Sequence, residues 1–167
     1  ITKMSTMIPC PQCGTKNRFP TFSVINVEDQ PDRRDAILER TLSQETCENC
    51  GTQYRGPPEF SYFDRRRHQW IDTFPWDQRD GWREAEQEAR SMYDVYAQSD
   101  TSLAVRMRKA PLNRRVTFGW EALREKLVAA RHKLDDVTLE LLKSEVSRQS
   151  PGQAEGDSDL RLLEADK

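Results

Sequence analysis

The chain has 167 residues, of which 35% are hydrophobic and 32% are charged, and its formal net charge is −2. This length corresponds to one domain, or to one domain with an appendage. The near-neutral charge argues against a general binder of nucleic acids or membrane surfaces. Because the sequence has no run of about 18 apolar residues, we expect no segment that spans a membrane.

Two cysteine pairs, each followed by glycine, frame the region 8–56, which comes after an expected N-terminal extension over residues 1–7. The pairs read Cys10-Pro11-Gln12-Cys13-Gly14 and Cys47-Glu48-Asn49-Cys50-Gly51. Two residues between the cysteines let one tight turn point both sulfurs at one ion, and the glycine tolerates a positive φ that keeps backbone N–H groups near the sulfurs. Two such turns together predict a closed cage of four thiolates that holds one structural Zn²⁺.

Other interpretations of the four cysteines stay open. Disulfides are typical of small secreted domains, but the chain shows no N-terminal apolar signal segment. The same cage accepts iron. A catalytic zinc ion would need an open coordination position, which four thiolates do not leave. A redox switch, in which oxidation ejects the metal, is a further alternative. Reduced thiols and the lack of an export signal indicate the cytoplasm.

The 33 residues between the pairs exceed the roughly 15–20 of a compact four-cysteine zinc site, so we expect a folded insertion there. Phe22 to Val27 is rich in β-branched and aromatic residues and predicts a strand. A helix follows, with Pro31 at its first position and Asp32 in its first turn.

We predict that residues 57–118, the middle region of the chain, are rich in β-strands and contain one helix. We predict strands at 60–63 and 69–74, joined by a turn that carries three arginines and a histidine. From Asp80 the period becomes helical, and one apolar face predicts a long helix. It contains Trp82, Ala85, Ala89, Met92, Tyr93 and Tyr96. Alternating apolar residues over 103–108 predict a strand, a turn at Pro111 and Asn113 follows, and 116–118 is its expected partner strand.

The region 119–149 is expected to be helical. Gly119 precedes one helix, with Trp120, Leu123 and Leu127 facing inward. Asp135 is the expected N-cap of a last helix. Its inward stripe would be Val137, Leu141, Leu142 and Val146. Residues 150–167 are rich in acidic and small residues and predict a flexible acidic tail.

Two basic groups are weaker candidates for a binding surface. Arg65, Arg66 and Arg67 could contact phosphates while Trp70 stacks on a base, although an exposed turn is the simpler interpretation. Arg106, Arg108, Lys109, Arg114 and Arg115 form the second group, for which we favour a solvated face. Two isolated histidines and the lack of nucleophile or phosphate-binding motifs argue against an enzyme and against a small-molecule substrate.

The chain resembles the CpXC-domain family, which is named for its paired cysteine motifs. The first pair matches the C-P-x-C-G form fully, whereas the second has Glu48 where the family often has proline. The resemblance covers residues 8–148. It includes Val24–Val27, Pro31 and the following helix, Tyr62–Asp64, Trp120–Leu127 and Leu134–Val137. It implies a fold and four metal ligands, but no reaction.

These observations predict an α+β protein with a zinc-ribbon-like four-cysteine nucleus and short antiparallel strands, followed by about three helices and a small strand pair. One CpXC-like domain would cover 8–149. For function we expect a non-enzymatic structural-zinc protein that acts as a protein-interaction module or as an accessory subunit of a larger cytoplasmic assembly. A nucleic-acid- or transcription-associated zinc ribbon is the alternative, and the thiol-based redox switch is the second alternative.

Overall fold

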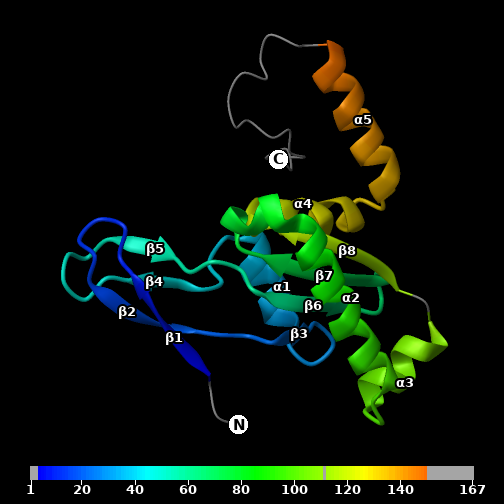
Figure 1. Cartoon of the computed structure of the whole chain (residues 1–167), viewed down its shortest axis with the longest axis horizontal. Helices are drawn as coiled ribbons and strands as arrows, with labels where there is room; N and C mark the ends of the chain where they lie inside the picture. Colours follow the sequence, from blue (N-terminus) through cyan, green and yellow to red (C-terminus); the bar gives the residue numbers. More distant parts are fainter. Residues whose placement is uncertain (1–3, 111, 150–167) are drawn as a thin grey trace. The chain divides into compact units, whose positions relative to one another are not determined.

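The computed structural model describes residues 4–110 and 112–149, and the chain divides into two compact units, Ile1–Trp120 and Glu121–Lys167 (Figure 1). The predicted tail at 150–167 and the turn residue Pro111 lie outside the described residues. The mixed α+β class is confirmed. Within the expected domain 8–149, the boundary between the units falls two residues after 118, where we placed the end of the β-rich middle.

Two short antiparallel ribbons carry the cysteine pairs. The first joins β1 (Ser5–Pro9) to β2 (Lys16–Pro20), and the second joins β4 (Gln44–Thr46) to β5 (Gln53–Arg55). Each cysteine pair lies in the turn between the two strands of its ribbon (Figure 1). Because β1 begins at Ser5, residues 5–7 belong to the first ribbon rather than to an N-terminal extension.

A four-stranded sheet forms the rest of the first unit's β-structure, in the order β3-β6-β7-β8. Its strands are β3 (Val24–Asn26), β6 (Phe60–Asp64), β7 (Gln69–Phe74) and β8 (Asn113–Phe118). The predicted β6–β7 hairpin is confirmed, but β3–β6 and β7–β8 are parallel pairs. Parallel strands need a long crossover. The segment from β3 to β6, which includes the second ribbon, supplies the first crossover, and the helical segment after β7 supplies the second.

Helices follow two of these strands in the first unit. The helix α1 (Pro31–Leu38) begins at Pro31 as predicted and buries Ile37. A 3₁₀ turn, η1 (Trp76–Gly81), leads into α2 (Trp82–Gln98), which confirms the predicted long helix. Ala85 and Ala89 of α2 pack with Phe74 of β7, while the rings of Tyr93 and Tyr96 pack on Trp70. One apolar layer of the first unit therefore lies between α2 and the sheet.

The strand predicted at 103–108 is wrong, because these residues form the helix α3 (Ser102–Lys109). The hydroxyl of Thr101 caps it by accepting the N–H of Ala104 at 3.2 Å. Ala104 and Met107, three residues apart, are the buried positions, and Met107 packs in the cluster around Trp70. The apolar alternation was compatible with either structure over so short a segment, and the cap and packing decide for the helix. The strand at 113–118 therefore pairs with β7 instead of with 103–108.

The helices α4 (Gly119–Arg131) and α5 (Asp136–Gln149) complete the described chain. The Asp135 cap is confirmed, since its carboxylate accepts the N–H of Thr138 at 2.8 Å. Leu123 and Leu127 are buried as predicted, and Trp120 is half-buried. The predicted inward stripe of α5 is wrong: Leu139 is buried, and all four residues expected to face inward are exposed. Among the described residues, no helix is both long and apolar enough to cross a bilayer.

Candidate metal centre

The four cysteine sulfurs converge on one point, with all Sγ atoms within 4.8 Å of one another. The Sγ atoms of Cys10 and Cys50 are 3.7 Å apart, and those of Cys13 and Cys47 are 3.6 Å apart. A disulfide bond would bring two sulfurs to about 2.05 Å. In a tetrahedron with metal–sulfur bonds of about 2.3 Å, neighbouring sulfurs lie about 3.8 Å apart. The cysteines are therefore placed to hold one tetrahedral metal ion.

The two cysteine turns have the same backbone structure. In each turn the glycine N–H donates to the carbonyl of the first cysteine at 2.9 Å, and that cysteine's N–H donates to the carbonyl of the threonine after the glycine, also at 2.9 Å. Gly14 and Gly51 have φ values of 76° and 73°, which confirms the predicted positive φ. A Cβ at either glycine would meet no atom within 4 Å, so backbone conformation rather than space favours glycine here.

Backbone N–H groups contact the first sulfur of each turn, as expected. A hydrogen bond from the backbone of Cys50 is the main cause that lowers the pKa of Cys47, and the Asn17 side chain and the backbone of Asn49 add to it, while burial opposes them. Burial is the main effect on Cys10 and raises the pKa of its thiol to about 11. At Cys13 the Thr15 side chain has the largest effect, and the pKa falls to about 5. A bound cation favours the thiolate form at all four positions.

Asn17 joins the two turns and was not predicted from the sequence. Its buried side chain lies on β2, where Nδ2 is 3.4 Å from the Sγ of Cys47 and 2.9 Å from the hydroxyl of Tyr54. Its Oδ1 accepts the N–H of Glu48 at 3.0 Å. Tyr54 in turn donates to the carbonyl of Ile8 at 2.8 Å. One amide therefore fixes the second turn against the first ribbon.

A repeat in the sequence could have indicated these supporting residues. Threonine follows the glycine in both turns, at Thr15 and Thr52, and the hydroxyl of Thr52 lies 3.3 Å from the Sγ of Cys50. Asn17 and Tyr54 occupy matching positions three residues after each glycine. Cys10 and Cys47 are buried while Cys13 and Cys50 are exposed, so one side of the cage faces solvent.

The first basic group does not form one surface with its aromatic residue. Arg65 pairs with Glu28 at 2.9 Å and Arg67 pairs with Asp64 at 3.2 Å, while Arg66 is exposed. Trp70 is fully buried, and its Nε1 donates to Asp72 at 2.9 Å. A base could stack on this ring only if the core opened.

The arginines of the second basic group each contact a different part of the first unit. Arg106 on α3 pairs with Glu28 at 2.8 Å, and Arg108 donates to backbone carbonyls at the end of α2. Hydrogen bonding from Arg65 is the main cause that lowers the pKa of Glu28, and Arg106 contributes to it. Arg114 stacks over the ring of Tyr93, with its guanidinium 4.7 Å from the ring centroid. These arginines link elements of the first unit to one another.

The buried carboxylate of Asp72 is a second polar site that sequence patterns did not indicate. It lies on β7 beneath α2 and is 3% exposed. Besides Trp70, the hydroxyl of Ser61 donates to it across the β6–β7 pair. Burial is the largest effect on Asp72 and raises its pKa above the usual 3.8, although both hydrogen bonds oppose this. Both carboxylate oxygens of Asp72 therefore accept hydrogen bonds within the fold.

Comparison with known proteins gives one match. Neither the curated proteins nor the solved structures that were compared with the chain matched it. The model of one protein family, described as CpXC protein, matches residues 8–143. That match covers most of the chain and includes the four cysteines of the metal centre. The chain therefore belongs to the CpXC family.

Proposed function

We propose that the protein is a non-enzymatic zinc protein that works as an interaction module, or as an accessory subunit of a larger cytoplasmic assembly. The four-thiolate cage supports the metal part of this proposal, because thiolates in a tetrahedron suit Zn²⁺. All four ligand positions come from cysteine, which favours a structural over a catalytic ion. When bound, the ion supplies a cross-link between the two ribbons.

One surface observation carries the interaction part. Trp76 on η1 and Trp82 at the start of α2 are 40% and 48% exposed. Arg79 stacks over Trp76 at 4.2 Å, and Arg83 stacks over Trp82 at 4.8 Å. Tryptophan and arginine are the residue types most enriched among those that dominate binding energy at protein interfaces. These two stacked pairs on consecutive elements support a role in binding another protein.

The test compares three single substitutions in the tagged full-length chain, purified from its native cell. We expect Trp82→Ala to remove an associated protein that wild type retains. Val95→Ala is the matched control, since Val95 lies on the same helix and is 71% exposed. If the associated protein still copurifies with both Trp76→Ala and Trp82→Ala, these tryptophans do not form the binding surface. Metal analysis of each sample shows separately whether zinc is bound.

The two alternatives have weaker support. The nucleic-acid hypothesis used Trp70 for stacking, and this ring is in the core. The redox hypothesis has one observation in its favour, the exposure of Cys13 and Cys50. Zinc release by low peroxide, with two thiolates oxidised to a disulfide and the peroxide reduced, would favour that alternative.

A further inference from the structure

Trp120 connects the second ribbon to the sheet. Its indole Nε1 donates a hydrogen bond to the carbonyl oxygen of Gly56, the residue after β5, at 2.7 Å. The guanidinium of Arg55, the last residue of β5, stacks on the same ring with its central carbon 3.7 Å from the ring centroid. The ring of Phe60 on β6 lies 5.7 Å away, centroid to centroid. Trp120 therefore contacts one residue of the sheet and two residues where the second ribbon ends.

The position of Gly56 depends on both ribbons. Its N–H donates to the carbonyl of Ser43, just before β4, at 2.9 Å. A Cβ at Gly56 would be 3.0 Å from the side chains of Ile8 on β1 and Phe19 on β2, so glycine lets the two ribbons meet closely here. The carbonyl that Trp120 binds is therefore held in place by the packing of one ribbon against the other.

The same packing continues to the metal centre. The side chain of Asn17 is 3.4 Å from the Sγ of Cys47 and 2.9 Å from the hydroxyl of Tyr54. The ring centroids of Tyr54 and Phe19 are 5.0 Å apart, and Phe19 in turn meets Gly56. A continuous set of contacts therefore leads from a cysteine sulfur to the carbonyl of Gly56. Packed contacts of this kind can carry energetic coupling to a distant residue.

Trp76 of the proposed binding surface lies against the start of α4. Gly119, with a φ of 78°, begins this helix directly before Trp120. A Cβ at Gly119 would lie 3.6 Å from the Cβ and the Cε3 of Trp76. We call Gly119 and Trp120 the junction. A change in how Trp120 is held therefore reaches Trp76 through a single intervening residue.

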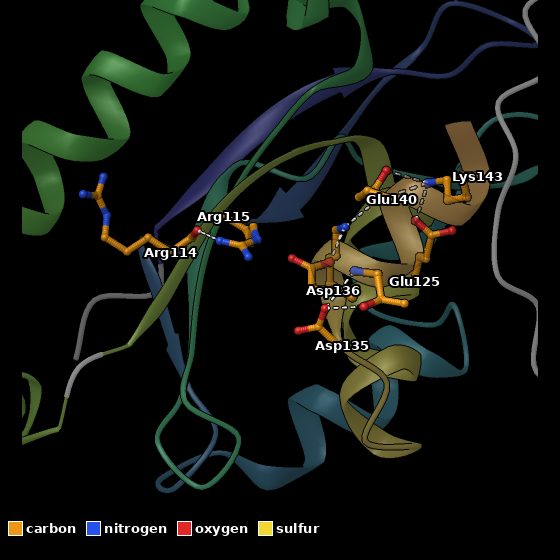
Figure 2. A network of polar contacts seen from close by, with 9 residues as sticks. Arg114, Arg115, Glu125, Asp135, Asp136, Glu140 and Lys143 are labelled. Atoms are coloured by element: carbon orange, nitrogen blue, oxygen red, sulfur yellow. Dashed lines mark hydrogen bonds and ion pairs between the residues drawn. The ribbon is translucent and has the colours of Figure 1, made fainter. Parts of the chain in front are cut away.

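The rest of α4 has a separate anchor. Lys143 of α5 contacts Glu125 of α4 at 2.9 Å, and these two side chains are only 14% and 1% exposed (Figure 2). Lys126 of α4 contacts the carboxylates of Asp136 and Glu140 on α5. Because these ion pairs lie within the second unit, they hold α4 against α5 whether or not the ribbons are intact. A change that starts in the ribbons should therefore be confined to the junction.

We propose that the junction couples the metal centre to Trp76, so that the binding surface changes when the metal is lost. This coupling rests on the metal part of the proposed function. Without the metal cross-link, the ribbons bury too little apolar surface to keep Gly56 in place. Trp120 then loses its hydrogen bond and the stacked Arg55, and it keeps only Phe60, which belongs to the sheet and is 7% exposed.

Coupling of this kind is reciprocal, so contacts that depend on the metal also strengthen metal binding. Trp120→Phe removes the N–H and keeps an aromatic ring. Losing one hydrogen bond changes an equilibrium constant by about 2–10-fold, and we expect the zinc dissociation constant to rise by that factor. Competition with a chromophoric chelator measures it. Tyr96→Phe removes a polar atom from an aromatic ring of α2 and is the matched control, which should leave the constant unchanged.

Fluorine NMR of the full-length chain, labelled with fluorotryptophan, tests the coupling directly. It follows all four tryptophans, whose resonances are assigned by single Trp→Phe substitutions. Removing zinc with a chelator should shift the resonances of Trp120 and Trp76 and leave that of the fully buried Trp70 in place. The zinc-dependent shift of Trp76 should be lost in Trp120→Phe and retained in Tyr96→Phe.

Two results would overturn the coupling alone. One is a Trp120 resonance that does not move when zinc is removed, and the other is a zinc-dependent Trp76 shift that persists in Trp120→Phe. A Trp70 shift as large as that of Trp120 would also overturn it, because the whole unit would then be unfolding. A purified protein that binds no zinc would overturn both the coupling and the metal part of the proposed function. The associated protein plays no part in these measurements, so failure of the interaction part would leave the coupling standing.

Discussion

The two ribbons and the four-stranded sheet belong to the same unit but are stabilised by different means. Apart from Cys10 and Cys47, the ribbon strands and their turns bury one apolar side chain, Phe19. In the sheet, by contrast, all five residues of β6 are buried, and Trp70, Tyr62 and Phe63 are completely enclosed. A segment with so little apolar burial needs a cross-link of another kind, such as a metal ion.

The ribbons and the sheet of the first unit are therefore stabilised by different interactions. In the ribbons, the free energy of binding the proposed metal ion would also be free energy of folding, because the four sulfurs are brought together only in the folded state. In the sheet, the stabilising contribution comes from aromatic burial under α2. Metal loss should therefore disrupt the ribbons first, and changes in the sheet core should leave the cage geometry intact.

The largest effect is expected for Cys13→Ser. The substitution removes one of four thiolates, so we expect loss of the metal and unfolding of at least residues 8–56. Elemental analysis measures the metal, and hydrogen exchange followed by mass spectrometry locates the unfolded segment. Met7→Ser, at a 52% exposed position of β1, is the matched control and should keep both. If soluble Cys13→Ser kept the melting temperature and the metal content of wild type, the ribbons would not depend on this thiolate for their stability. The proposed difference between the ribbons and the sheet would then be wrong.

A smaller effect is expected for Asn17→Ala. The substitution leaves the four ligands in place and removes the amide that joins the two turns. Loss of such a supporting contact typically lowers metal affinity by about 10–100-fold. Competition with a chromophoric chelator measures the affinity, with Lys16→Ala as the control at the exposed neighbouring position. Equal affinities for wild type and Asn17→Ala would show that ligand spacing alone holds the cage.

The smallest effect concerns the sheet and its dependence on pH. Burial raises the pKa of Asp72 in the folded state above its usual 3.8. Between the unfolded and the folded pKa the native protein binds more protons, so this group lowers the free energy of unfolding as pH rises through that interval. Asp72→Asn removes this contribution while Ser61 can reorient to keep its hydrogen bond. The free energy of unfolding of Asp72→Asn, relative to that of wild type, should therefore increase as pH rises and then level off.

Urea unfolding at a series of pH values measures this difference, and metal loss at low pH cancels because both proteins share it. Asp77→Asn, at an exposed position of η1, is the control and should run parallel to wild type. A constant difference between Asp72→Asn and wild type across the same range would show that Asp72 does not titrate differently in the folded sheet.

Local patterns predicted the elements that local geometry controls. The Cys-x-x-Cys-Gly spacing places two sulfurs and a positive φ within five residues, and the structure confirms both turns and their convergence. The long helix α2 and the hairpin at 60–74 were also confirmed, although Trp82 of the predicted apolar face is exposed. The eight residues of α3 were too few for a reliable period, and packing of Met107 beside Trp70 decided their structure.

The sequence by itself therefore determined the two cysteine turns, the α+β class and the main helix, because each depends on residues a few positions apart. Only the tertiary structure decided which partners those elements take. It paired β8 with β7 in parallel, brought Asn17 to Cys47, 30 residues further along the chain, and buried Asp72 beneath α2. It also turned Leu141 and Leu142 of α5 outward, while Glu125 and Lys126 of α4 form ion pairs with Lys143 and Asp136 of that helix.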